Sequence, residues 1–232
     1  ESIPFNEKAY YIAINEPGAS NNNNGLSPTY EGGINGPFKD FSFDPPEFKP
    51  GDVIFIREGI YILDNEITLS NGGSNDNPVI LRNYPGERLV LEGDERLGNV
   101  LRLNAPHITV QCLEIVGGRR NTILMKDDYQ IIRYNIIRNA GNDGIKTLPD
   151  ADHGVIEYNE IFNFDHEGID LFGGSDWIVR GNDIHHSTNT GSNDEEHTSH
   201  GFFTKGGSSN VIIEDNYIHD LISIEGDRNK HT

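Results

Sequence analysis

Short runs of β-branched residues recur along most of the chain at a nearly constant interval. Five such segments close on isoleucines that are 22, 24, 23 and 34 residues apart, namely Ile115, Ile137, Ile161, Ile184 and Ile218. One strand of this kind cannot bury its apolar face alone, so successive copies must stack and share a continuous core. The pattern predicts an all-β solenoid with turns of about 22 to 24 residues.

An asparagine stands two residues before the closing isoleucine in four of these segments. These residues are Asn135, Asn159, Asn182 and Asn216. In a stacked coil, side-chain amides at equivalent positions can bond to the backbone of the turns. We therefore expect an inward-facing asparagine ladder with a structural role.

The N-terminal part lacks this repeat but contains alternating apolar strands near residues 9–14 and 53–57. Pro45 and Pro46 argue against a long helix between them, which leaves room only for a short helix across residues 38–43. We expect one domain over residues 1–232, with residues 1–60 as entry and cap and residues 61–232 as solenoid turns. No amphipathic helix follows Ile218, so we expect a longer chain or another subunit to cover the C-terminal end.

Charge narrows the range of partners. The chain carries 37 acidic and 18 basic residues, a net charge of -19, which makes nucleic acid and anionic membrane surfaces poor partners. An acidic ligand would need a cation between it and the protein. Cys112 is the only cysteine, and we expect a buried thiol in a strand. The chain begins at Glu1 without methionine, which favours a processed, secreted protein or a shortened chain.

Several segments resemble a known superfamily. Pro50-Gly51-Asp52-Val-Ile-Phe-Ile, Asn77-Pro78-Val-Ile-Leu and Tyr84-Pro85-Gly86-Glu87, followed by the repeat, are similar to the opening of many secreted pectate-lyase-like proteins. The resemblance implies a right-handed parallel β-helix. Fold alone does not fix an activity.

Three segments align on a glycine that follows a polar residue: Asp143-Gly144-Ile-Lys146, Glu167-Gly168-Ile-Asp170 and His200-Gly201-Phe-Phe203-Thr-Lys205. Side chains alternate along a strand, and neighbouring strands lie about 4.8 Å apart. Lys146, Asp170 and Phe203 should therefore meet on one outer strip, with Lys205 close by.

The strip contains hard oxygen donors. Asp143, Glu167 and Asp170, with Asp165 or His166 as further candidates, suit calcium, which takes six to eight oxygens. The arrangement resembles family 9 polysaccharide lyases, which implies that these three residues are calcium ligands and that Lys205, before Gly206-Gly207, is the general base. His166 and Glu167 stand where that family has paired aspartates, and Phe203 stands where it has its lysine.

Three functions follow as hypotheses. The first is a secreted, calcium-dependent lyase that cleaves an acidic, uronate-containing polysaccharide by β-elimination. The second is a non-catalytic β-helix module that binds glycans or builds a surface structure. The third is an inverting glycoside hydrolase that uses Asp143 and Asp170, whose carboxylates should then lie about 6.5 to 9.5 Å apart.

Two further features of the sequence are weaker signals of a ligand-binding site. The interval between Ile184 and Ile218 exceeds the repeat because residues 187–199 are inserted, and Asp194, Glu195 and Glu196 in that insertion are additional ligand candidates or a solvated tip. Histidines 166, 185, 186, 197, 200 and 219 have no tight metal-binding spacing, so a transition-metal site is the less favoured reading.

Overall fold

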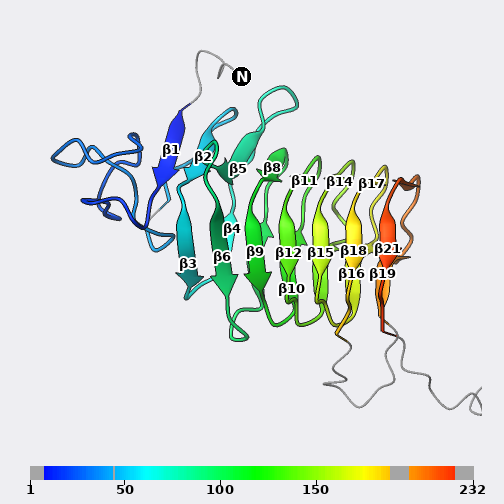
Figure 1. The fold of residues 1–232 in the computed structure, drawn as a ribbon. Coiled ribbons are helices and arrows are strands. Elements are labelled where there is room, and N and C mark those ends of the chain that lie inside the picture. Colours follow the sequence, from blue (N-terminus) through cyan, green and yellow to red (C-terminus); the bar gives the residue numbers. More distant parts are fainter. Residues whose placement is uncertain (1–7, 44, 189–198, 223–232) are drawn as a thin grey trace, which may run out of the picture.

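The structure is a computed structural model that describes residues 8–43, 45–188 and 199–222. These residues form 21 strands and no helix, and every strand pair is parallel (Figure 1). In this part of the chain, accordingly, no helix is long and apolar enough to cross a membrane. The short helix considered for residues 38–43 does not form, because Phe38 is extended and exchanges backbone hydrogen bonds with Tyr11 and Ala13.

The strands step in threes, so that each turn gives one strand to each of three sheets. The first sheet runs in the order β1 (Ala9–Ile12), β2 (Val53–Ile56), β5 (Val79–Asn83), β8 (Ile108–Gln111), β11 (Ile131–Arg133), β14 (Val155–Glu157), β17 (Ile178–Arg180) and β20 (Ile212–Glu214). The second contains β3 (Gly59–Leu63), β6 (Leu89–Gly93), β9 (Glu114–Gly117), β12 (Ile136–Arg138), β15 (Glu160–Phe162), β18 (Asp183–His185) and β21 (Tyr217–His219). The third contains β4 (Ile67–Leu69), β7 (Asn99–Leu103), β10 (Asn121–Met125), β13 (Asp143–Thr147), β16 (Glu167–Phe172) and β19 (His200–Lys205).

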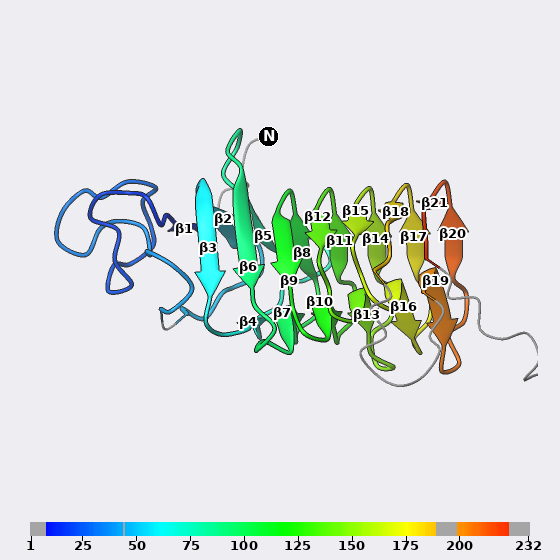
Figure 2. The ribbon, with the colours of Figure 1, turned by 60° about the horizontal axis from the view of Figure 1, so that its bottom comes forward.

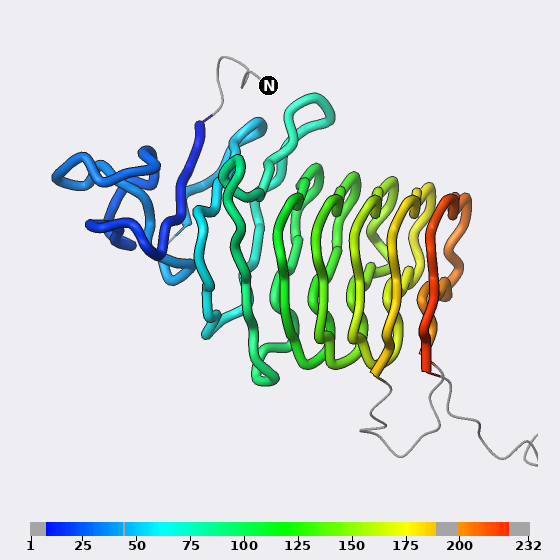
Figure 3. The backbone as a smooth tube through the Cα atoms, viewed as in Figure 1, coloured from blue at the N-terminus to red at the C-terminus, as the bar shows by residue number. Residues whose placement is uncertain are grey.

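This arrangement is a right-handed parallel β-helix, as the sequence predicted (Figures 2 and 3). The closing isoleucines of the repeat face inward and stack in register. Ile115, Ile137, Ile161 and Ile184 are fully buried at equivalent positions of the second sheet. Their equivalent in the last described turn, Ile218, is 42% exposed.

Each repeat segment is bent, which the sequence pattern did not show. What reads as one strand is two, one in the first sheet and one in the second, joined by a residue in the left-handed conformation. Tyr134 (φ 56°) and Tyr158 (φ 54°) occupy this corner. Cys112 (φ 59°) does so too, which makes it a half-buried corner residue and not a buried strand residue.

A glycine takes the same corner in the turn of β17 and β18. Gly181 has φ 61°, and a Cβ atom there would lie 2.5 Å from the ring of Tyr158. Only a residue without a side chain fits against that ring. Tyr158 in turn stacks on Tyr134 with ring centroids 5.3 Å apart.

The asparagine ladder forms as predicted, directly after this corner. The Asn159 amide nitrogen donates to Ile132 O and to Asn182 Oδ1, while its oxygen accepts from the backbone and side-chain nitrogens of Asn135. Asn216 continues the ladder by accepting from Asn182. The first three rungs are buried, so each amide satisfies corner backbone groups that water cannot reach.

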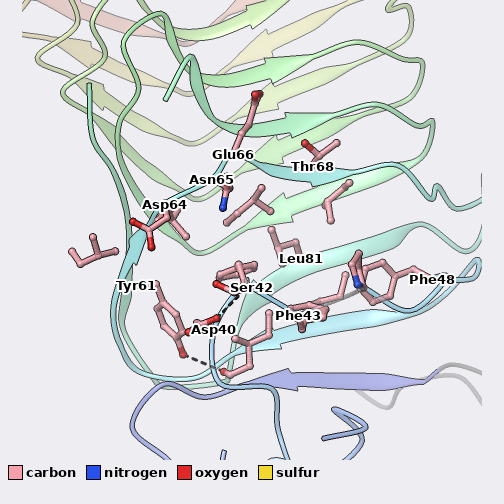
Figure 4. Close-up of a pocket in the computed structure, with 18 residues that line it drawn as sticks. Asp40, Ser42, Phe43, Phe48, Tyr61, Asp64, Asn65, Glu66, Thr68 and Leu81 are labelled. Carbon is pink, nitrogen blue, oxygen red and sulfur yellow. Dashed lines mark hydrogen bonds between the residues drawn. The ribbon is translucent and has the colours of Figure 1, made fainter. Parts of the chain in front are cut away.

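At the N-terminal end, residues 38–43 and 45–48 pack over the first turn. Phe38 stacks on Phe43 at 4.0 Å, and Tyr10 meets the edge of Phe48 at 5.2 Å. Between this segment and the strands lies a cavity of about 280 Å³, with Phe41, Leu63 and Leu81 among its apolar lining and Asp40, Asp64 and Glu66 among its polar lining (Figure 4).

We predict that Asn159→Ala destabilises the fold by about 3 kcal/mol, because it removes the acceptor of the buried Asn135 backbone N–H and the side-chain donor to Ile132 O and Asn182 Oδ1. Urea denaturation of the variant and the parent measures this. Asn75→Ala, in an exposed turn, is the control and should change stability by less than about 0.5 kcal/mol. Equal effects of the two substitutions would contradict a structural role for the ladder.

Candidate functional site

The candidate site lies on the outer face of the third sheet, over β13, β16 and β19. The register pairs Lys146 with Asp170 and Asp170 with Phe203, and it pairs Phe172 with Lys205. The glycine-aligned segments therefore do begin equivalent strands, as expected from the sequence.

Two lysines converge on one carboxylate. Asp170 is fully buried, and its Oδ2 contacts both Lys146 Nζ and Lys205 Nζ, the latter at 2.9 Å. Lys146 Nζ also lies 3.1 Å from Asp143 Oδ2. An isolated buried carboxylate would cost several kcal/mol, and these ammonium groups compensate for that cost.

In Asp143 and Asp170, one of the two carboxylate oxygens accepts no hydrogen bond from the described residues. Asp143 Oδ1 and Asp170 Oδ1 are buried and, within the described residues, have no hydrogen-bond donor. Buried polar atoms are rarely left without a partner, and such cases are found where an ion or water belongs. Both oxygens are thus available to a cation.

A second group lies at the start of the same strands. Asp143, His166 and Glu167 each offer a ligand atom within 4.8 Å of the others. His200 Nδ1 lies 3.6 Å from Glu167 Oε1. Of the three predicted calcium ligands, Asp143 and Glu167 therefore come together directly, while Asp170 is joined to them through Lys146.

Burial sets the protonation of this group. Burial, and a hydrogen bond that protonated Asp143 donates to Glu167, raise the pKa of Asp143 to about 7, although the nearby Lys146 ammonium lowers it. For Lys146, burial lowers the pKa, but Asp143 and Asp170 outweigh it, so that the pKa is raised overall. Lys146 is consequently a permanent ammonium at neutral pH and a poor proton acceptor.

Lys205 is the more accessible of the two lysines, with a side chain 39% exposed against 22% for Lys146. Its ammonium lies 5.1 Å from the centre of the Phe203 ring and 5.9 Å from that of Phe172. The rings and Asp170 hold the ammonium on the outer strip, where solvent can reach it.

The inserted segment is anchored beside this group. Thr188 donates from its backbone nitrogen to Phe164 O, and Ser199 Oγ donates to Asp165 O. The two acceptor residues, Phe164 and Asp165, directly precede His166 and Glu167 in the sequence. The predicted ligands Asp194, Glu195 and Glu196 lie outside the described residues.

Comparison with known proteins assigns the chain to a family of β-helix proteins. A family model described as "Pel9A-like, right handed beta helix region" matches residues 22–177, more than half of the chain. The chain belongs to this Pel9A-like family. The match includes Asp143, Glu167 and Asp170 and ends before Lys205.

Solved structures agree with the family. A crystal structure of pectate lyase Pel9A superposes with a TM-score of 0.61 at 15% identity, over 96% of this chain and 66% of that one. A rhamnogalacturonan lyase superposes with a TM-score of 0.51 at 12% identity, over 91% of this chain and 67% of that one. The chain thus spans about two thirds of each, and at these identities the likeness shows the fold. A search of curated proteins gave no significant match.

The acidic group of this Pel9A-like chain fits a calcium ion in its chemistry. Carboxylate oxygens dominate the donor set, and two of them are buried without donors among the described residues. The sequence had singled out the carboxylates but gave Lys146 little weight. The alignment on glycine was the available signal, since it puts Lys146 directly beside Asp170.

We predict that Asp143→Asn becomes increasingly stabilising, relative to the parent, as pH rises. A carboxyl with a raised pKa holds its proton in the folded state between about pH 4 and pH 7 while the unfolded chain has lost it, so the parent loses stability as pH rises through that window. Asparagine resembles the protonated acid and does not titrate, so the variant does not lose stability in this way as pH rises. Urea denaturation with a chelator at about pH 5 and about pH 8 measures the difference, and an equal difference at both values would contradict it.

Proposed function

We propose that this protein is a secreted, calcium-dependent polysaccharide lyase that cleaves a uronate-containing, pectate-like glycan by β-elimination. The observation that supports it most directly is the accessible Lys205 ammonium held over the buried Asp170, beside the Asp143, His166 and Glu167 group, on a Pel9A-like β-helix. Because the chain has a net charge of -19, an acidic polymer would need cations between itself and the protein surface.

The reaction has defined requirements. The carbon next to the uronate carboxylate loses a proton, a double bond forms to the neighbouring carbon, and the glycosidic C–O bond on that neighbour breaks. Asp143, Glu167 and Asp170 would hold calcium, which when bound supplies positive charge to the substrate carboxylate and makes the adjacent C–H more acidic. The leaving oxygen takes up a proton as the bond breaks.

Lys205 is the proposed general base. It accepts the proton only as a neutral amine, so its ion pair with Asp170 must open before the transfer. Lys146 is unsuited to the role because it is bound to two carboxylates and remains charged. We assign to Lys146 the neutralisation of Asp143 and Asp170.

The geometry does not favour an inverting hydrolase. One ammonium nitrogen contacts both Asp143 and Asp170, which brings those carboxylate oxygens closer than the roughly 6.5 to 9.5 Å that leaves room for a water nucleophile. A non-catalytic glycan-binding module remains the alternative, and the assay below distinguishes it by the absence of product.

We predict that Lys205→Ala lowers kcat by about 10² to 10⁴, as expected for loss of a general base. The assay follows the ultraviolet absorbance of the unsaturated product on a panel of uronate polymers, with calcium or with a chelator. Lys126→Ala is the control, since Lys126 forms no ion pair within the described part of the chain. Near-normal turnover in Lys205→Ala would remove Lys205 from the mechanism, and no product from the parent on any polymer would favour the glycan-binding module.

We also predict that calcium raises the melting temperature of the parent and that Asp170→Asn abolishes this rise. The substitution keeps the shape of the side chain but removes the charge shared by Lys146 and Lys205. Differential scanning calorimetry with and without calcium measures the shift. Absence of calcium binding by titration calorimetry, with and without polymer, would rule out the ligand assignment.

A further inference from the structure

A group of histidines and carboxylates lies on the outer face of the second sheet, a different face from that of the candidate active site. Asp183 and His185 belong to β18 and His219 to β21, adjacent strands of the second sheet (Figure 1). Because Ile184 points inward, its neighbours Asp183 and His185 point outward, and the register places His219 directly beside His185.

The three side chains converge. Each offers a ligand atom within 4.8 Å of the others, and His219 Nε2 lies 3.1 Å from Asp183 Oδ1. Tetrahedral zinc with ligands at about 2.0 to 2.1 Å separates its ligand atoms by about 3.4 Å, so small side-chain rotations would bring these three onto one ion. Glu160 Oε1, 3.4 Å from His185 Nε2, is placed to be a fourth ligand.

The histidines stand at a repeat position that holds other residue types in the turns before them. The residues equivalent to His185 and His219 in the three preceding turns are Val116, Arg138 and Phe162, none of which binds metal ions of this kind, and the turn before these has Glu92. Imidazoles occur at this position only in the two described turns that flank the insertion. His185 and His219, on either side of the insertion in the sequence, are paired in neighbouring hydrogen-bonded strands, and their rings stack with centroids 5.0 Å apart.

We propose that Asp183, His185 and His219 bind a divalent transition-metal ion, with zinc as the best match, and that this ion clips β21 to β18. Two imidazoles and a carboxylate are the ligand set of a borderline cation, whereas calcium prefers oxygen alone. A metal bridge between residues 185 and 219 closes a turn of 34 residues, longer than the usual 22 to 24, and closing a longer loop removes more conformational entropy from the unfolded chain. The clip is separate from the proposed lyase chemistry and does not depend on it.

The test uses the full chain, freed of metal by a chelator, and follows zinc by titration calorimetry and by melting temperature. We expect zinc to bind and to raise the melting temperature of the parent, and His185→Asn or His219→Asn to weaken binding at least about tenfold. His153→Asn is a matched control, because His153 also stacks on a neighbouring ring and lies 3.4 Å from an aspartate but has no second histidine beside it.

His166→Asn separates this site from the acidic group on the third sheet. The proposal requires that zinc binding survive in His166→Asn and in His153→Asn. It is overturned if the parent binds no zinc, or if binding is lost in His166→Asn and kept in His185→Asn and His219→Asn. Melting without metal shows that each variant is folded, so a lost zinc response is assigned to the site.

Discussion

Each turn of this β-helix is held in register with the next by parallel main-chain hydrogen bonds and by asparagines that bond to the turns on either side. A slip of one residue would turn the buried isoleucines outward and take the asparagine amides away from the corner backbone groups. The apolar stack and the polar ladder thus enforce the same register. With the register fixed, residues some 23 positions apart lie one strand spacing from each other.

That spacing explains the electrostatics of the outer strip. Strand neighbours cannot move apart, so a buried carboxylate in one turn must be balanced by a cation in the same turn or an adjacent one. On the second sheet such a pair lies nearer the surface, where Arg138 pairs with Glu114 and each side chain is 29% exposed. On the third sheet Asp170 is completely buried, and two lysines from the turns on either side contact it. A partly exposed pair of the first kind contributes little, whereas removal of both lysines at Asp170 would leave a buried charge uncompensated.

Repetition and alternation were readable from the sequence, and they predicted the solenoid, the asparagine ladder and the alignment of β13, β16 and β19. The bend within each repeat was not readable, since tyrosines at 134 and 158 carry no signal for a left-handed backbone, and only Gly181 at the equivalent place hints at it. The same limit applies to the site. Alternation put Lys146 beside Asp170, but the bridge from Lys146 to Asp143 depends on the length and path of a flexible side chain.

The insertion shows how far the register governs the fold. It lengthens one corner, between the second and third sheets, yet Asn216 still accepts from Asn182 across 34 residues and Ile218 still pairs with Ile184. The coil therefore continues in register on both sides of the insertion, which separates β18 from β19 in the sequence. Both groups of histidine and carboxylate side chains border this corner, one on each sheet. A solenoid acquires new chemistry most easily at such a corner, because a loop there adds groups to the surface without altering the stacking beneath it.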